Sequence, residues 1–381
     1  MPKHQNPTST TTALVLQGGG ALGAYQGGAY EALAAAGREP DWLAGVSIGA
    51  INSALIAGNP PGRRAERLRE FWQRVTSFVP STAWAGPDGL LRAWANNVAA
   101  GWGMLFGLPG FFQPRFDTAT CCPVSGAAPS VYDTGPLRDT LLAMVDFKRI
   151  NSGPTRLSVG AVDVQSGNFV YFDSRRQQLG PEHVMASGAL PPGFPPVTID
   201  GRAYWDGGLV SNTPLRHVAE NLEAREATIF QVDLFSARGA VPRTLNQVAD
   251  REKDIRFSSR TRALTDMLRE RHEMRRTLRE LAALLPAARR ADPRVARKLA
   301  ALGANGADPT ITLVHLIHRH RNAETQTRDY EFSRESMQEH WDAGRADMAH
   351  SLRSLAQGGD AAGPGVFRVF DYTAPAKESQ P

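Results

Sequence analysis

The sequence predicts an α/β protein in which a mainly parallel sheet is covered by helices. Over the first 235 residues, short apolar runs typical of buried strands alternate with segments of helical apolar spacing. Glycine-rich turns follow two of the first strands and each opens a helix, as expected for parallel strands joined by helices. After Phe235 the apolar spacing is helical on a densely charged background, which predicts a helical C-terminal extension.

The strands and helices are expected in a regular order along the chain. Buried strands are predicted over 13–17, 42–46, 156–164, 169–173, 197–205 and 228–235. Helices are predicted over 23–36, 48–57, 136–145, 181–187 and 214–222. The last three open near a proline, whose missing N–H costs nothing at an early helical position. Beyond 240 we expect a long helix or helical pair over 245–285, a strand over 310–317, a helix over 333–355 and a strand over 366–372.

These elements divide the 381 residues into a domain of about residues 12–240 and a basic, mainly helical region at 241–373. Residues 1–11 and 374–381 are expected to be disordered ends. The net charge is +5, but residues 251–300 alone carry fifteen Arg or Lys against seven Asp or Glu, so the basic character is local. A solvated, salt-bridged helix face explains such a run most simply, and attraction to anionic lipid is the alternative. No nucleic-acid recognition signature accompanies the charge, so no nucleic-acid partner is expected.

Cysteine content and hydropathy exclude several classes of protein. The two cysteines, Cys121 and Cys122, are neighbours, which excludes a disulfide framework and gives no zinc spacing, so no metal is expected. The apolar run at 13–16 is too short for a signal peptide. The longest uncharged, mostly apolar stretch, 98–112, has fifteen residues, whereas a membrane-spanning helix needs about 20. We therefore expect a cytoplasmic protein that contacts a membrane at most peripherally.

A glycine-rich loop, Gly18-Gly19-Gly20-Ala21-Leu22-Gly23, follows the first strand and opens the first helix. Bare backbone N–H groups at a helix N-terminus can hold an anion. The anion can be a dinucleotide pyrophosphate, since the spacing fits G-x-G-x-x-G and Asp41 lies 18 residues beyond. It can also be the oxyanion of an acyl-transfer reaction. The loop alone leaves both functions open, together with a turn that binds nothing.

A second motif favours acyl transfer. Gly45-Val46-Ser47-Ile48-Gly49 follows the second strand and starts the second helix, the context of a G-x-S-x-G nucleophile elbow. The turn is so sharp that side chains two positions either side of the serine would collide, so Gly45 and Gly49 fit there. The elbow would expose the Ser47 hydroxyl at the carboxyl end of the sheet, with the Ile48 N–H facing the group it attacks.

A third motif, Asp206-Gly207-Gly208, follows an apolar strand and precedes Asn212. Taken alone, it is more simply an ordinary polar turn than a catalytic group. In this order, the three motifs resemble those of the patatin-like phospholipase family, in which an oxyanion loop, a G-x-S-x-G elbow and a D-G-G/A motif follow one another. The run from Pro191 to Pro196, preceded by Ala186-Ser187, is similar to the family's ASxxxPxxFPP block. The resemblance covers about residues 12–235.

The resemblance implies a three-layer α/β hydrolase fold and a serine lipid acyl hydrolase of phospholipase A or esterase type, without metal or cofactor. Ser47 would attack the ester and Asp206 would act as the base, through an acyl-enzyme intermediate. The oxyanion hole would be formed by Gly18, Gly19, Gly20, Ala21 and Ile48, with support from Gly207, Gly208, Asn212 and Pro191. Many members carry Arg or Lys at the position of Leu22, so a positive charge often found beside the loop is missing here.

Several alternatives stay open at this point. A Ser-Asp-His triad could be completed by one of four histidines, His217, His315, His318 or His320. The same dyad could serve an intracellular polyester or thioester hydrolase. The chain could also be a Rossmann-like NAD(P)-binding oxidoreductase or a membrane-surface binder without catalysis. The aromatic segment 84–116, with three tryptophans and four phenylalanines, is either a helical core insert or a lid or interfacial anchor, and the two can coexist. Oligomeric state is not predicted.

Overall fold

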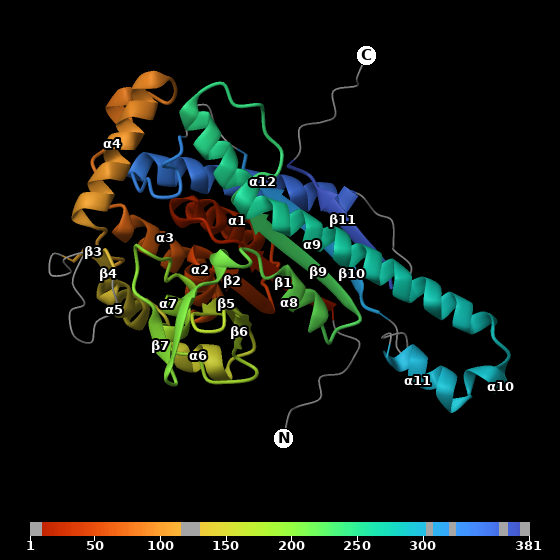
Figure 1. Ribbon diagram of the computed structural model, residues 1–381. Helices are drawn as coiled ribbons and strands as arrows, with labels where there is room; N and C mark the ends of the chain where they lie inside the picture. The colour runs from red at the N-terminus through yellow and green to blue at the C-terminus, as the bar shows by residue number, and fades with distance from the viewer. Residues whose placement is uncertain (1–9, 116–129, 302–307, 320–324, 358–364, 374–381) are drawn as a thin grey trace, which may run out of the picture.

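The computed structural model describes residues 10–115, 130–301, 308–319, 325–357 and 365–373. It confirms the α/β class, with a mainly parallel sheet between two layers of helices (Figure 1). The strand predicted to start the domain begins at Thr10, within the segment expected to be disordered. Cys121, Cys122, His320, residues 1–9 and the tail at 374–381 lie outside the described residues.

The sheet has the order β11-β10-β9-β1-β2-β5-β8-β7, and β6 also pairs with β5. The parallel strands are β1 (Thr10–Leu16), β2 (Trp42–Val46), β5 (Arg156–Asp163), β9 (Glu226–Asp233), β10 (Thr310–Ile317) and β11 (Phe367–Asp371). Three further strands are antiparallel: β6 (Phe169–Asp173) and β8 (Arg202–Asp206) each pair with β5, and β7 (Val197–Ile199) pairs with β8. A separate two-stranded sheet is formed by β3 (Gln113–Pro114) and β4 (Tyr132–Asp133). The single strand predicted over 197–205 is thus a hairpin, because Asp200 and Gly201 adopt positive φ angles and turn the chain.

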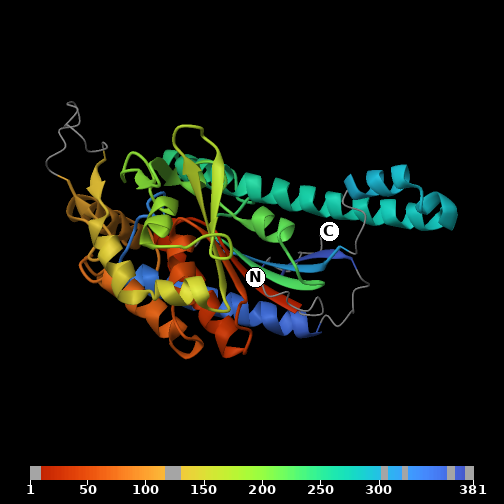
Figure 2. The same ribbon diagram turned by 90° about the horizontal axis from the view of Figure 1, so that it is seen from below.

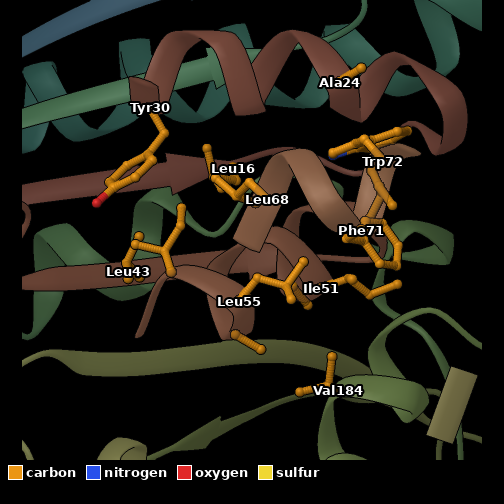
Figure 3. Close-up of a cluster of buried hydrophobic side chains, with 14 of the residues drawn as sticks. Leu16, Ala24, Tyr30, Leu43, Ile51, Leu55, Leu68, Phe71, Trp72 and Val184 are labelled. Carbon is orange, nitrogen blue, oxygen red and sulfur yellow. The ribbon is translucent and has the colours of Figure 1, made fainter. Parts of the chain in front are cut away.

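Both faces of the sheet are buried, which explains why its strands are apolar at successive positions. In β1, Leu14 and Leu16 point to one hydrophobic cluster, whereas Ala13 and Val15 point to another on the opposite face. Figure 3 shows part of the first cluster, where side chains of β1 and β2 meet those of α2 (Ile48–Ala57), α3 (Arg64–Val75) and α7 (Pro181–Ser187). Each face therefore needs its own layer of helices.

Helices α1 (Gly23–Ala35), α2, α3 and α12 (Arg334–Gln357) cover the face of the first cluster, and α8 (Leu215–Glu220) and α9 (Leu245–Leu284) cover the other. Small residues allow α1 and α12 to approach closely. A Cβ on Gly28 would lie 1.8 Å from the Trp341 carbonyl oxygen, and one on Gly344 would lie 1.9 Å from that of Tyr25. The remaining helices are α4 (Leu90–Phe106), α5 (Gly135–Met144), α6 (Phe147–Ser152), α10 (Ala287–Arg290) and α11 (Pro293–Ala301).

The chain beyond residue 240 contributes to the same sheet and to the same core. Strand β10 pairs with β9, β11 pairs with β10, and α12 packs on α1. Helix α9 is one continuous helix, and its distal part projects beyond the sheet together with α10 and α11 (Figure 2). Within the described ranges, no helix combines the length and the apolar character needed to cross a bilayer.

Candidate active site

Ser47 lies in a sharp turn between β2 and α2, with a φ of 56° and a ψ of −126°. Such a conformation is costly for a residue with a side chain and persists where the surroundings enforce it. The glycines on either side are required by contacts. A Cβ on Gly45 would lie 2.2 Å from the Gly49 carbonyl oxygen, and one on Gly49 would lie 2.3 Å from that of Leu16 in β1. The motif thus forms the expected strand-turn-helix elbow, and Ser47 stands at the N-terminus of α2.

The register of the sheet brings Asp206 to the level of Ser47. Val46 pairs with Gly160, and the next residue of β5, Ala161, pairs with Asp206 at the end of β8. Ser47 and Asp206 therefore flank β5 at the same height, and the Ser47 hydroxyl lies close enough to the Asp206 carboxylate to lower its pKa. Close packing at this point requires Gly207, because a Cβ there would lie 2.7 Å from the Gly160 carbonyl oxygen.

The Asp206 carboxyl group is almost completely buried, with 2% of its surface exposed. Burial raises its pKa to about 6, against the Ser47 hydroxyl and the Gly208 N–H, which lower it. The Gly208 N–H donates to Asp206 Oδ1 over 2.7 Å and fixes the carboxylate. A carboxylate with this pKa is a better proton acceptor than one at the ordinary value, and it is still ionised at pH 7.

The glycine-rich loop lies beside this pair and is held by Asn212. The Asn212 side chain donates to the Gly18 carbonyl over 2.9 Å, while the Gly18 N–H donates to the Asn212 carbonyl over 3.2 Å. The Gly18 N–H is therefore engaged. In the part of the chain that the structure describes, the N–H groups of Gly19 and Gly20 have no hydrogen-bond partner, and both residues line the same cavity as Ser47.

The Ala21 N–H, expected as an oxyanion donor, is also engaged. It donates to the backbone carbonyl of Asp329 over 2.7 Å. The same oxygen lies against Gly20, where a Cβ would come within 1.9 Å of it. Lys253 of α9 holds Asp329 in place, because its ammonium group contacts Asp329 Oδ1 at 2.6 Å and the Gln326 carbonyl at 2.8 Å. The C-terminal region therefore contacts the glycine-rich loop directly.

A cavity of about 500 Å³ opens above Ser47 and has a mostly apolar lining. Its size is within the range of small-molecule sites. Apart from the elbow, the loop and Asp206, the lining includes the predicted residues Pro191, Gly208 and Asn212, and a group of aromatic and apolar side chains: Met104, Phe111, Phe112, Tyr132, Leu190, Phe194, Phe235, Phe257, Tyr330 and Phe332. Such a lining favours an apolar group, which gains free energy when its surface leaves water.

Two polar residues that organise the site were not singled out from the sequence. The Ser47 N–H donates to the hydroxyl and the carbonyl of Ser187, and the Ser187 hydroxyl donates to the Gly160 carbonyl over 2.6 Å. The Ser47 N–H therefore points away from the cavity. Gln17 accepts from the N–H groups of Leu234 and Phe235 and so ties the end of β1 to the end of β9. The only sequence signal was that Ser187 belongs to the block preceding Pro191.

The described histidines do not line this cavity. His217 is 3.0 Å from Asp173 Oδ2 and packs against Trp42, the first residue of β2, whereas Ser47 follows the last. His315 lies in β10, and His318 packs against Tyr25 of α1. A triad through any of these three is not supported by their positions.

Two further residues considered from the sequence, Asp41 and Leu22, do not line the cavity. Asp41 precedes β2 and accepts a hydrogen bond from the Thr12 N–H, at the end of the parallel strands opposite the glycine-rich loop. An acid that binds a dinucleotide ribose would be needed at the loop edge. Leu22 is fully buried in the first hydrophobic cluster. Across the described ranges, no cluster of three or more acidic, His or Cys side chains could hold a metal ion.

Comparison with known proteins gives two family matches. A model of the family described as Patatin-like phospholipase matches residues 14–121 and 125–219, more than half of the chain, and one described as Patatin phospholipase matches residues 255–359. No curated protein matches. Among solved structures, VipD from Legionella pneumophila is 15% identical with a TM-score of 0.37, over 90% of this chain and 67% of that chain. The type III effector protein ExoU is 15% identical with a TM-score of 0.30, over 92% of this chain and 53% of that chain.

Proposed function

Since this chain belongs to the patatin-like phospholipase family, we propose that it is a serine lipid acyl hydrolase that uses Ser47 and Asp206. The observation that carries the proposal is that Ser47 and the buried Asp206 lie on either side of β5 at the same height and line the same apolar cavity. Family membership supports the lipid substrate class, and the contacts of these two residues support the nucleophile and its base.

The first step forms an acyl-enzyme. The Ser47 oxygen attacks the ester carbonyl carbon while Asp206 accepts the hydroxyl proton, and the carbonyl electron pair moves to its oxygen. The free N–H groups of Gly19 and Gly20, with that of Ile48 at the start of α2, would stabilise this oxyanion. One such donor is typically worth about 3 kcal/mol of the activation barrier. The bond to the leaving alcohol then breaks, and Asp206 returns its proton to the alkoxide.

The second step releases the acid. A water molecule attacks the acyl carbon, Asp206 accepts a proton from it, and collapse of the intermediate breaks the bond to the Ser47 oxygen, which recovers the proton. The donors that serve the first oxyanion serve the second as well, since both lie above the same serine. Asp206 must cycle between its two protonation states, which a pKa of about 6 makes accessible near neutral pH.

The substrate is proposed as a class rather than a single lipid. The aromatic and proline-rich cavity wall favours an acyl chain, which gains free energy when its surface leaves water. No positive side chain lines the cavity among the described residues, and Leu22 is buried where many family members carry a basic residue. We therefore propose no preference for an anionic head group.

A fluorophosphonate probe tests the nucleophile. The wild-type protein should be labelled, and Ser47→Ala should abolish both labelling and hydrolysis across a panel of phospholipids, acylglycerols and short acyl esters. The matched control is Ser53→Ala, because Ser53 is a buried serine of the same helix. Labelling that survives in Ser47→Ala would refute the assignment of Ser47. A wild-type protein that resists the probe and binds NADH would instead support the dinucleotide alternative.

A further inference from the structure

Helix α4 presents large apolar side chains to solvent. Leu91, Trp94 and Leu105 are 55%, 58% and 67% exposed, and Val98 is 44% exposed. Their spacing of three, four and seven residues places them on one face of the helix. Figure 1 shows α4 at one edge of the molecule. The helix therefore shows solvent the face that a helix of a globular protein normally turns to the core.

The opposite face of α4 carries small and polar residues. Arg92, the only charged residue of the helix, is 3% exposed and donates to Asn96 Oδ1 over 2.9 Å and to Glu339 Oε1 of α12 over 3.0 Å. Asn96 is also buried, next to Ala95 and Ala99. The protein thus buries the only cation of this helix and leaves Leu91, Trp94 and Leu105 exposed to water. Burial of apolar surface alone would disfavour this arrangement.

Further exposed apolar residues extend this face. Trp84 is 61% exposed and packs edge-on against Trp94, with ring centroids 6.1 Å apart, and Phe78 is 52% exposed beside Trp102. We call the whole set the α4 face: Phe78, Trp84, Leu91, Trp94, Val98, Met104, Leu105 and Phe106. Residues 93–114 contain no charged side chain at all. Interpretation of the aromatic segment as a core insert is therefore wrong for Trp84 and Trp94.

The α4 face adjoins the mouth of the candidate active-site cavity. Met104, near the end of α4, lines the cavity together with Tyr132, whose hydroxyl donates to the Met104 carbonyl over 2.8 Å. The ring of Phe112 lies 4.7 Å from that of Tyr132 and 5.3 Å from that of Phe194, so aromatic rings line the way inward from this rim. An acyl chain that leaves a lipid layer at the α4 face would reach Ser47 along apolar surface.

We propose that the α4 face is the surface by which this protein settles on a lipid layer, with the cavity mouth turned towards the same layer. The proposal rests on the proposed function, which makes a lipid the substrate. An uncharged face rich in tryptophan and leucine fits the boundary between head groups and acyl chains, where aromatic rings are favoured. Continuity with the cavity argues for lipid over a second copy of the chain.

The basic helix α9 is the rival membrane surface. Several of its arginines are paired with acidic partners: Arg256 with Glu252, Arg269 with Asp266, Arg271 with Glu220 and Arg276 with Glu280. Pairing reduces the net attraction of a basic helix to anionic lipid. The two surfaces differ in their salt dependence, because apolar insertion is insensitive to screening and electrostatic attraction is lost as salt increases.

Vesicle sedimentation tests the proposal. Wild-type protein should bind phosphatidylcholine vesicles, and salt or anionic lipid should change the affinity by less than about twofold. Trp94→Glu and Leu91→Glu should each weaken binding at least about tenfold, because a charge at the interface opposes insertion. The matched control is Leu284→Glu, an 81% exposed leucine at the far end of α9, which should leave binding unchanged. Hydrolysis of vesicle lipid should fall with binding, whereas turnover of a dispersed short-chain ester should stay within about twofold.

Three results would overturn the α4 assignment. The first is binding that survives in Trp94→Glu. The second is binding that requires anionic lipid and disappears at high salt, which would favour α9. The third is a wild-type dimer that Trp94→Glu converts to a monomer with unchanged vesicle binding, which would show that a second copy covers the face. Sedimentation needs no turnover, so binding without hydrolysis of either substrate would refute the proposed function and not the membrane surface.

Discussion

Lowering the pH from 7 to 5 should reduce kcat/KM about tenfold, because Asp206 can accept the Ser47 proton only when it is ionised. Its pKa of about 6 is set by burial. With that value about 91% of the carboxyl groups are ionised at pH 7 and about 9% at pH 5. An Asp at the ordinary value of 3.8 would be about 94% ionised at pH 5, and the rate would barely change.

The assay is kcat/KM on a dispersed chromogenic ester between pH 4.5 and pH 8, read at a wavelength where the signal does not depend on pH. Circular dichroism over the same range separates titration of the base from unfolding. A rate that is flat from pH 7 to pH 5 in folded protein would refute the argument that a buried carboxylate is the base.

The same carboxylate should destabilise the fold when it is ionised. Its folded pKa lies above the ordinary 3.8, so its contribution to stability falls as the pH rises from about 4 to about 6, by up to about 3 kcal/mol. Asp206→Asn should therefore lower kcat/KM at least about a hundredfold and also raise the melting temperature at pH 8. Loss of activity with a lower melting temperature would mean that the variant disturbs the fold.

Three other variants test separate contacts. Lys253→Met should lower kcat by up to about tenfold, because Asp329 would hold the glycine-rich loop less firmly. Lys298→Met is the control. A faster Lys253→Met variant would mean that Asp329 obstructs the loop. His217→Gln should leave kcat/KM within about twofold and lower the melting temperature, since His217 forms a hydrogen bond with Asp173. A rate loss of several orders of magnitude would support a catalytic triad that includes His217. Asp233→Asn should raise the free energy of unfolding at pH 8 by up to about 4 kcal/mol and change it little at pH 4, because burial raises the pKa of Asp233 to about 7. Denaturant titrations at the two pH values measure the effect. Equal effects at both pH values would show that the stability gain does not come from ionisation of Asp233.

Local sequence patterns predicted most strands of the large sheet, the elbow and the loop, because each depends on residues close in the chain. The two glycines around Ser47 are an example, since a side chain on either would collide with the backbone of the same five-residue turn or of the neighbouring strand β1. Helix α3 was not predicted, although Leu68, Phe71, Trp72 and Val75 have a helical spacing and are buried. The α4 face was ambiguous, because periodicity shows that residues share a face and not whether that face turns inward.

The contacts that complete the site could not be predicted, because they join residues far apart in the chain. The Asp329 carbonyl reaches Ala21 from 308 positions away, and nothing in the local sequence around either residue indicates it. The Ser187 contact with the Ser47 N–H is similar, since it depends on the register of β2, β5 and α7. The hairpin at Asp200 and Gly201 is an intermediate case, because a glycine inside a strand pattern indicates a turn or bulge but does not show that the strand reverses there.

The pairing of β10 with β9 limits how this protein can be shortened. A fragment cut at residue 240 would retain every motif of the candidate site and would leave β9 as a bare outer strand, with a row of N–H and C=O groups open to other chains. It would also lack the Asp329 carbonyl that accepts the hydrogen bond from the Ala21 N–H. The motifs of the candidate site therefore cannot be transferred or expressed without the distal strands that complete the sheet.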